Sequence, residues 1–154
     1  MKSFLAVVSL LLLAGASGMS NAADPETSML QFAQRKHSQG DPLVTTIGIY
    51  GVRAGTAAHW DFAQYNDPVR GEAWATEFGA GYLLPTRVNL YFGGGLVAGY
   101  RRNGGEYFGA WYPEVGAVVL LTDGLGVSVS RKRYQKLYQQ IEDVVMFGLV
   151  LTMK

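Results

Sequence analysis

The strongest constraint in this sequence is a two-residue alternation in which one face is bulky and apolar and the other face is small. In residues 71–84 one face carries Trp74, Phe78 and Tyr82, whereas the other carries mainly Gly and Ala. Residues 86–100 repeat the pattern, and residues 124–134 repeat it with Gly and Ser on the small face. Successive side chains of a strand point to opposite faces, so the alternation predicts β-strands.

The composition of the small face indicates which side is the interior. A strand surface that meets water is normally rich in Lys, Glu and Thr. Gly, Ala and Ser instead suit the interior of a narrow eight-stranded barrel, which side chains just fill. The large apolar face is then expected to contact lipid. The predicted lipid-facing or interfacial side chains are Trp74, Phe78, Tyr82, Phe92, Tyr100 and Phe147, and Tyr65, Tyr107 and Tyr134 are also expected near the outer rim.

Short tight turns alternate with more polar, mostly longer connections. Pro85 and Asp123-Gly124 mark two tight turns, and Asp-Gly favours hairpins. This asymmetry is typical of outer-membrane barrels, which have short periplasmic turns and longer outer loops. Seven strands are visible, at 43–52, 56–65, 71–84, 86–100, 106–121, 124–134 and 141–153. An even number requires an eighth, for which residues 28–37 are the candidate, although a short helix is an alternative there.

The first 22 residues have the order of a secretory signal peptide. Lys2 supplies the positive start, an apolar run extends from Phe4 to Ala14, and small residues precede Ala22. The run is shorter than the roughly 20 residues of a membrane-spanning helix. We therefore expect export, cleavage after Ala22 with Ala23 as the alternative, and one domain over residues 23–154. Thirteen basic residues less Lys2 balance twelve acidic ones, so charge does not indicate a nucleic-acid partner.

The leader, the alternating strands, the turns at Pro85 and Asp123, and the apolar last strand resemble the small bacterial outer-membrane β-barrel proteins. The resemblance is architectural and covers nearly the whole mature chain. It implies an all-β fold, an eight-stranded antiparallel up-and-down transmembrane barrel, in the outer membrane of a Gram-negative cell. It also implies assembly by the barrel assembly machinery. Lys154 departs from the aromatic last residue usual in that class, and Phe147 is the nearest candidate.

Several charged and polar residues fall on the inward face. We expect a buried network of His59, Asp61, Glu77, Arg87, Asn89 and Glu114, which Tyr112 joins if the register allows. An isolated charge in a closed interior is costly, so Arg87 is expected to pair with a carboxylate. The functional alternative is a narrow polar pore.

A second charged group falls on the predicted outer loops and rim. Arg101, Arg102, Arg131 and Arg133, accompanied by Lys132 and Lys136, are expected to bind phosphates of outer-leaflet lipopolysaccharide. Solvated loop charge explains the same residues equally well.

Catalysis and metal binding find little support in the sequence. His59 with Asp61, and His37 with Ser38, lack a recognisable nucleophile spacing. Two histidines and no cysteine favour neither a metal site nor a cofactor. We therefore predict a non-enzymatic structural or surface-interaction protein. Two alternatives stay open: a soluble periplasmic β-barrel or sandwich that binds an apolar ligand, and an outer-membrane lipid-modifying enzyme.

Two strands leave local questions. Proline cannot donate to a strand ladder, so Pro113 must lie at a bulge or near the outer rim. In residues 43–52, Ile47 and Ile49 point opposite to Tyr50 and Val52, so the inward face is ambiguous.

Overall fold

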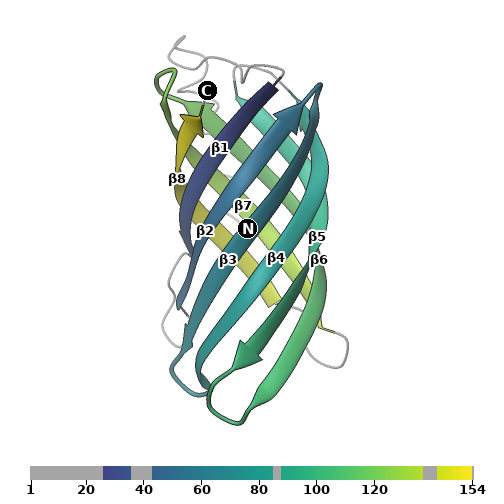
Figure 1. Cartoon of the computed structure of the whole chain (residues 1–154), viewed down its shortest axis with the longest axis vertical. Coiled ribbons are helices and arrows are strands. Elements are labelled where there is room, and N and C mark those ends of the chain that lie inside the picture. The colour runs from purple at the N-terminus through teal and green to yellow at the C-terminus, as the bar shows by residue number, and fades with distance from the viewer. Residues whose placement is uncertain (1–25, 36–42, 85–87, 137–141, 154) are drawn as a thin grey trace.

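The computed structural model describes residues 26–35, 43–84, 88–136 and 142–153. They form eight antiparallel strands closed into one barrel (Figure 1). The predicted eight-stranded antiparallel barrel is therefore confirmed. The expected leader, His37, Ser38, Pro85, Arg87 and Lys154 lie outside the described residues. The strands are β1 Glu26–Arg35, β2 Leu43–Arg53, β3 Thr56–Asp67, β4 Gly71–Leu84, β5 Asn89–Arg101, β6 Glu106–Leu120, β7 Leu125–Lys136 and β8 Glu142–Met153.

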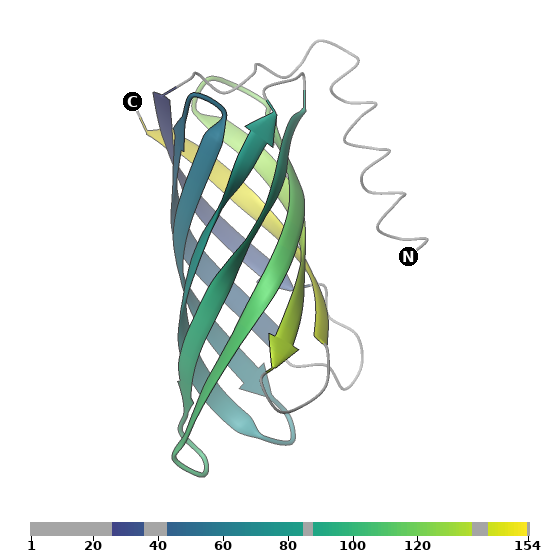
Figure 2. The ribbon, with the colours of Figure 1, turned by 90° about the vertical axis from the view of Figure 1, so that its right-hand side faces the viewer.

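Each strand pairs with its neighbour in the sequence, and β1 pairs with β8 to close the sheet. The closing register joins Ser28 to Met153 and Arg35 to Met146. The helix alternative for residues 28–37 is wrong, because residues 26–35 form a strand bonded on both sides. The β5–β6 hairpin extends farthest at the end opposite the C-terminus (Figure 2).

Bulky apolar side chains point away from the barrel axis. Trp74, Phe78, Tyr82, Phe92 and Tyr100 are all exposed, up to 69% for Tyr82, and Phe147 is half-buried. Ile47 and Ile49 are also exposed, so the inward face of β2 is the one that carries Val44 and Val52. These outward aromatic side chains therefore do not form a central core as they would in a soluble sandwich.

The interior is filled by small and medium side chains in two apolar layers. The inner layer, next to the start of β1 and the end of β8, contains Met29, Val52, Ala57, Leu83, Tyr91 and Val150. The outer layer contains Ala33, Val44, Ala63, Ala75, Val97, Ala110, Tyr112, Tyr134, Val144 and Met146. The charged side chains described below lie between these layers.

Pro113 points outward within β6, opposite Gly94 of β5. The ladder to β7 is interrupted at Tyr112 and Pro113 and resumes at Glu114 without a shift in register. No bulge therefore forms at Pro113, one of the two positions expected for it, and proline costs only the local ladder bonds. In the described part of the chain, no helix combines the length and apolar character needed to cross a membrane.

Candidate functional site: a buried charged network

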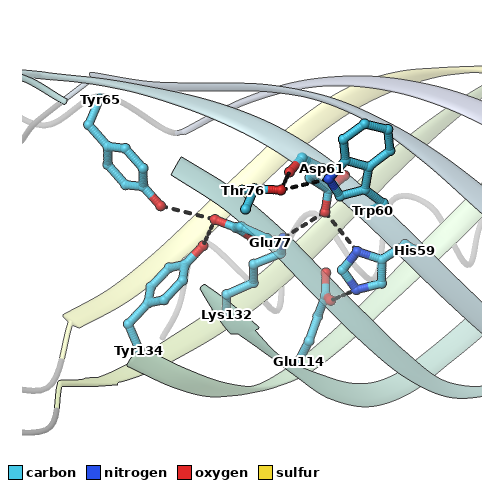
Figure 3. A network of polar contacts seen from close by, with 9 residues as sticks. All are labelled: His59, Trp60, Asp61, Tyr65, Thr76, Glu77, Glu114, Lys132 and Tyr134. Carbon is cyan, nitrogen blue, oxygen red and sulfur yellow. Dashed lines mark hydrogen bonds and ion pairs between the residues drawn. The ribbon is translucent and has the colours of Figure 1, made fainter. Parts of the chain in front are cut away.

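Five charged or titratable side chains meet inside the barrel, and we call them the charged network: His59, Asp61, Glu77, Glu114 and Lys132 (Figure 3). They come from β3, β4, β6 and β7 and are all buried. Alternation brings them inward, because each shares the small face of its strand. Buried charges require partners, so the contacts of each member decide what the network can do.

Lys132 lies at the centre of the charged network. Its Nζ donates to Glu77 Oε2 at 2.6 Å and to Asp61 Oδ2 at 3.3 Å. The same ammonium lies 5.0 Å from the ring centroid of Tyr112, within the range of a cation–π contact. Lys132 thus neutralises carboxylates from two strands that lie on the other side of the interior.

Two tyrosines complete the hydrogen bonds of Glu77. The hydroxyls of Tyr65 and Tyr134 donate to Oε1 at 3.0 and 2.8 Å. With Lys132 on Oε2, the fully buried Glu77 carboxylate accepts three hydrogen bonds. These three donors satisfy the buried carboxylate inside the closed barrel.

His59 bridges the two remaining carboxylates. Its Nδ1 lies 2.7 Å from Asp61 Oδ2, and its Nε2 lies 3.2 Å from Glu114 Oε2. A neutral imidazole carries one N–H, so only the imidazolium can donate toward both acidic groups. The ring stacks on Tyr50, with centroids 4.6 Å apart. The charged network then holds two cations and three carboxylates.

Two glycines provide the space that these side chains occupy. A Cβ at Gly79 would collide with the His59 ring, and a Cβ at Gly48 would collide with the Asp61 carboxylate. Each glycine is the cross-strand partner of the residue it accommodates. The small face of the alternation is therefore a steric requirement of the charged network.

The lumen around the charged network is closed. Between the charged network and the inner layer lies a cavity of about 30 Å³, lined by residues that include Tyr50, Tyr91, Glu114 and Ser128. This is room for about one or two water molecules. Apolar layers lie above and below. The geometry fits a polar plug better than a pore.

The structure brings together four members of the predicted set, His59, Asp61, Glu77 and Glu114. Asn89 is buried at the start of β5, four residues before Gly93, the cross-strand partner of Glu114. It therefore lies nearer the inner end of the barrel than the charged network does. Arg87, the expected cation, lies outside the described residues.

Sequence reasoning missed Lys132 and the roles of two tyrosines. Lys132 was expected on the outer rim, but it belongs to the inward series Ser128, Ser130, Lys132 and Tyr134 of β7. Extending that series by two residues would have identified it. Tyr65 and Tyr134 were expected at the rim among interfacial residues, yet both point inward to Glu77.

The four arginines predicted to share a surface site do not cluster. Arg101 is in register with buried Ala73, so it lies on the inward face at the outer end of β5. Arg102 is exposed, 3.9 Å from Glu72. Arg131 pairs with Val115, and Val115 pairs with Phe92, which lies nine residues from Arg101 along β5. Arg131 is therefore far from Arg101 along the height of the barrel. It forms a 2.8 Å ion pair with Asp143, and Arg133 is exposed beside it on the same face of β7.

Metal binding finds no support in this geometry. Among the residues that the structure describes, no group of three or more His, Cys, Asp or Glu side chains is placed to hold a metal ion.

Comparison with solved structures identifies barrels of the same fold. The N-terminal β-barrel domain of Pseudomonas aeruginosa OprF matches with a TM-score of 0.71 and 14% identity, over 82% of this chain and 97% of that one. The Yersinia pestis outer membrane protein Ail matches with a TM-score of 0.57 and 15% identity, over 84% and 100%. Neisserial surface protein A matches with a TM-score of 0.52 and 14% identity, over 82% and 92%.

Comparisons with models of known protein families and with curated proteins give no match. At these identities the three barrels establish the fold of this chain and leave its role to be argued from its own residues.

Replacing Lys132 with Met tests the centre of the charged network. The change leaves Glu77 and Asp61 without their ammonium, so the free energy of unfolding should fall by about 3–5 kcal/mol. Urea unfolding in lipid vesicles measures the loss. Arg133→Met, on the exposed face of the same strand, is the control and should be nearly neutral. Equal losses in the two variants would contradict the central role of Lys132.

Two glycines of β2 give a matched test of the space requirement. Gly48→Ala pushes against Asp61 and should destabilise the barrel by about 1–3 kcal/mol, the usual cost of overpacking. Gly51→Ala meets nothing within 4 Å and should be close to neutral. The same urea titration compares them, and a neutral Gly48→Ala would show that the network does not need the space.

Proposed function

We propose that this chain is a small outer-membrane β-barrel protein with a structural or surface-interaction role. Residues 1–22 are its export signal and residues 23–154 its barrel domain. One observation carries the proposal: the barrel exposes its large apolar and aromatic side chains and buries its charged network. Such an inverted arrangement suits hydrocarbon outside and a polar, filled interior.

The dimensions and the closure of the barrel support a membrane position. The outward, mainly apolar face of β4 extends over eleven residues from Leu84 to Trp74, about 25 Å at a tilt of about 40°. An apolar band about 25 Å tall is typical of outer-membrane barrels. Closure between β1 and β8 leaves no unpaired strand edge, which a bilayer would penalise.

The filled interior supports a structural role for the charged network. Apolar layers lie on both sides of it, and only water-sized space remains between it and the inner layer. We therefore favour the plug over the narrow pore that the sequence left open. Recognition is then expected on the loops and the outer surface.

We infer that the protein is not an enzyme. The side chain of His59 is fully buried, and both of its ring nitrogens face carboxylates. It therefore has no free nitrogen to act as a base toward a substrate. The lipid-modifying alternative has no other histidine among the described residues.

The proposed partners are lipids, lipopolysaccharide and the barrel assembly machinery. Arg131 and Arg133 share an outward face of β7, and Arg102 lies on the β5–β6 turn. Guanidinium groups there suit phosphate oxygens at a membrane surface. Arg101 is a weaker candidate because it faces inward.

A heat-modifiability gel tests the membrane barrel. Mature protein refolded in vesicles should migrate faster unheated than boiled, because a closed ladder in lipid resists detergent. In cells, the protein should fractionate with outer membranes. A single heat-independent band together with recovery in the soluble periplasm would support the soluble-barrel alternative instead.

Charge reversal tests the lipopolysaccharide contact. Arg131→Glu with Arg133→Glu should lower co-purified lipopolysaccharide several-fold, because anionic phosphates would meet carboxylates. Arg53→Glu, on the outward face of β2 at the opposite end of the barrel, is the control and should retain the wild-type amount. Unchanged co-purification in the double variant, with folding intact by gel shift, would contradict the proposal.

A further inference from the structure

The outward apolar band differs greatly in height around the barrel. On β4 it runs from Leu84 to Trp74 and on β5 from Leu90 to Tyr100, eleven residues on each strand. On β1 it contains Leu30 and Phe32, between the outward residues Ser28 and Gln34. On β2, Thr45 separates Ile47 and Ile49 from half-buried Leu43, as Thr76 separates Phe78 from Trp74 on β4, and the run ends at Gly51. At the same tilt the runs on β4 and β5 span about 25 Å, the run on β2 about 15 Å and the run on β1 about 5 Å.

A hollow lies on the side where the band is short. It has a volume of about 590 Å³ and crosses β8, β1, β2, β3 and the edge of β4. Phe32, Ile47 and Phe62 form part of an apolar floor. Gln34, Thr45 and Gln64 also line it, and they lie side by side in one row of paired residues.

The polar row has the chemistry of a headgroup contact. Its amides and hydroxyl donate hydrogen bonds, and the Gln64 amide has a second N–H besides the one given to Glu72. Arg133, on nearby β7, adds positive charge at the flank beside the ion pair of Arg131 and Asp143. An apolar floor edged by neutral donors and flanked by cations matches a lipid with acyl chains, ester carbonyls and a phosphate.

We propose that this face, from β1 through β3, holds the bilayer thin. In the leaflet at the end of the barrel that carries the β5–β6 turn, which we call the loop end, lipids lower their headgroups to the row of Gln34, Thr45 and Gln64. Their chains fill the hollow beneath it. The inference rests on the proposed membrane position, and it adds a specific lipid contact and a side of the barrel. Bilayers do thin locally beside short hydrophobic surfaces.

The register provides two positions at equal depth on opposite sides. A path that starts at Glu26 of β1 and moves from each residue to its partner on the next strand ends at Val145 of β8. The neighbour of Val145, Met146, pairs with Arg35, so the path returns to the far end of β1 and not to Glu26. Each step to the next strand therefore rises by about 3 Å toward the loop end. From Gln34, four steps across the strands reach Tyr100, about 12 Å closer to the loop end. Leu96 lies four residues back along β5, about 10 Å farther from the loop end than Tyr100, and is therefore nearly level with Gln34.

Spin labels at these positions test the proposal. The chain has no cysteine, so Gln34→Cys and Leu96→Cys each give one labelling site. In phosphatidylethanolamine–phosphatidylglycerol vesicles, we expect a water-soluble nickel chelate to collide with the label at position 34 several-fold more often than with the label at position 96. Equal collision rates would overturn the proposal, because a bilayer of uniform thickness places both labels at one depth.

A second pair of labels separates thinning from a tilt of the whole barrel. By the same steps, Ser28 is level with Leu84 near the inner edge. Thinning leaves Ser28→Cys at least as accessible to the chelate as Leu84→Cys, whereas a tilt buries position 28 more deeply and overturns the proposal. Protection of position 34 from both oxygen and chelate would indicate a protein cover instead. Free chelate access at position 96 would show that the barrel is not inserted, and the proposed function would then fail first.

Discussion

The structure depends on the narrowness of an eight-stranded barrel. Inward side chains meet across a short distance, so every large one requires a small one beside it. His59 lies over Gly79 and Asp61 over Gly48, while Tyr112 lies over Gly95. Without those glycines, the charged network could not be packed between the apolar layers. The alternation of bulky and small faces is thus a consequence of filling a fixed volume.

Buried charges in such a space act more on register than on net stability. Taking five ionisable groups out of water is costly, and their mutual contacts only offset that cost when the geometry is good. The contacts of Lys132 reach 71 and 55 residues back in the sequence, to Asp61 and Glu77. A slip of one residue in β3, β4 or β7 would turn its charged residue toward the outside. The charged network therefore penalises misregistered barrels more than an apolar core would.

The sequence predicted the strands and the contents of the interior better than the contacts between its residues. Alternation needs only local order, so β4 and most other strands, and the inward positions of His59, Asp61, Glu77 and Glu114, could be read directly. Which of those side chains meet depends on the shear of the closed barrel, which one sequence does not display. Lys132 and Arg101 were misplaced because strands β7 and β5 continue beyond the polar residues that resemble loop starts.

The interior and the exterior of the barrel obey different constraints, and this bears on function. Inside, closure imposes the same demand on every strand, and the result is a filled lumen with two apolar layers. Outside, no packing requirement makes the strands alike, yet the apolar run covers eleven residues on β5 and three on β1. Because folding alone does not require this difference, the uneven outer surface is where the protein is expected to distinguish its surroundings. A plugged barrel of this kind interacts through its outer surface and loops.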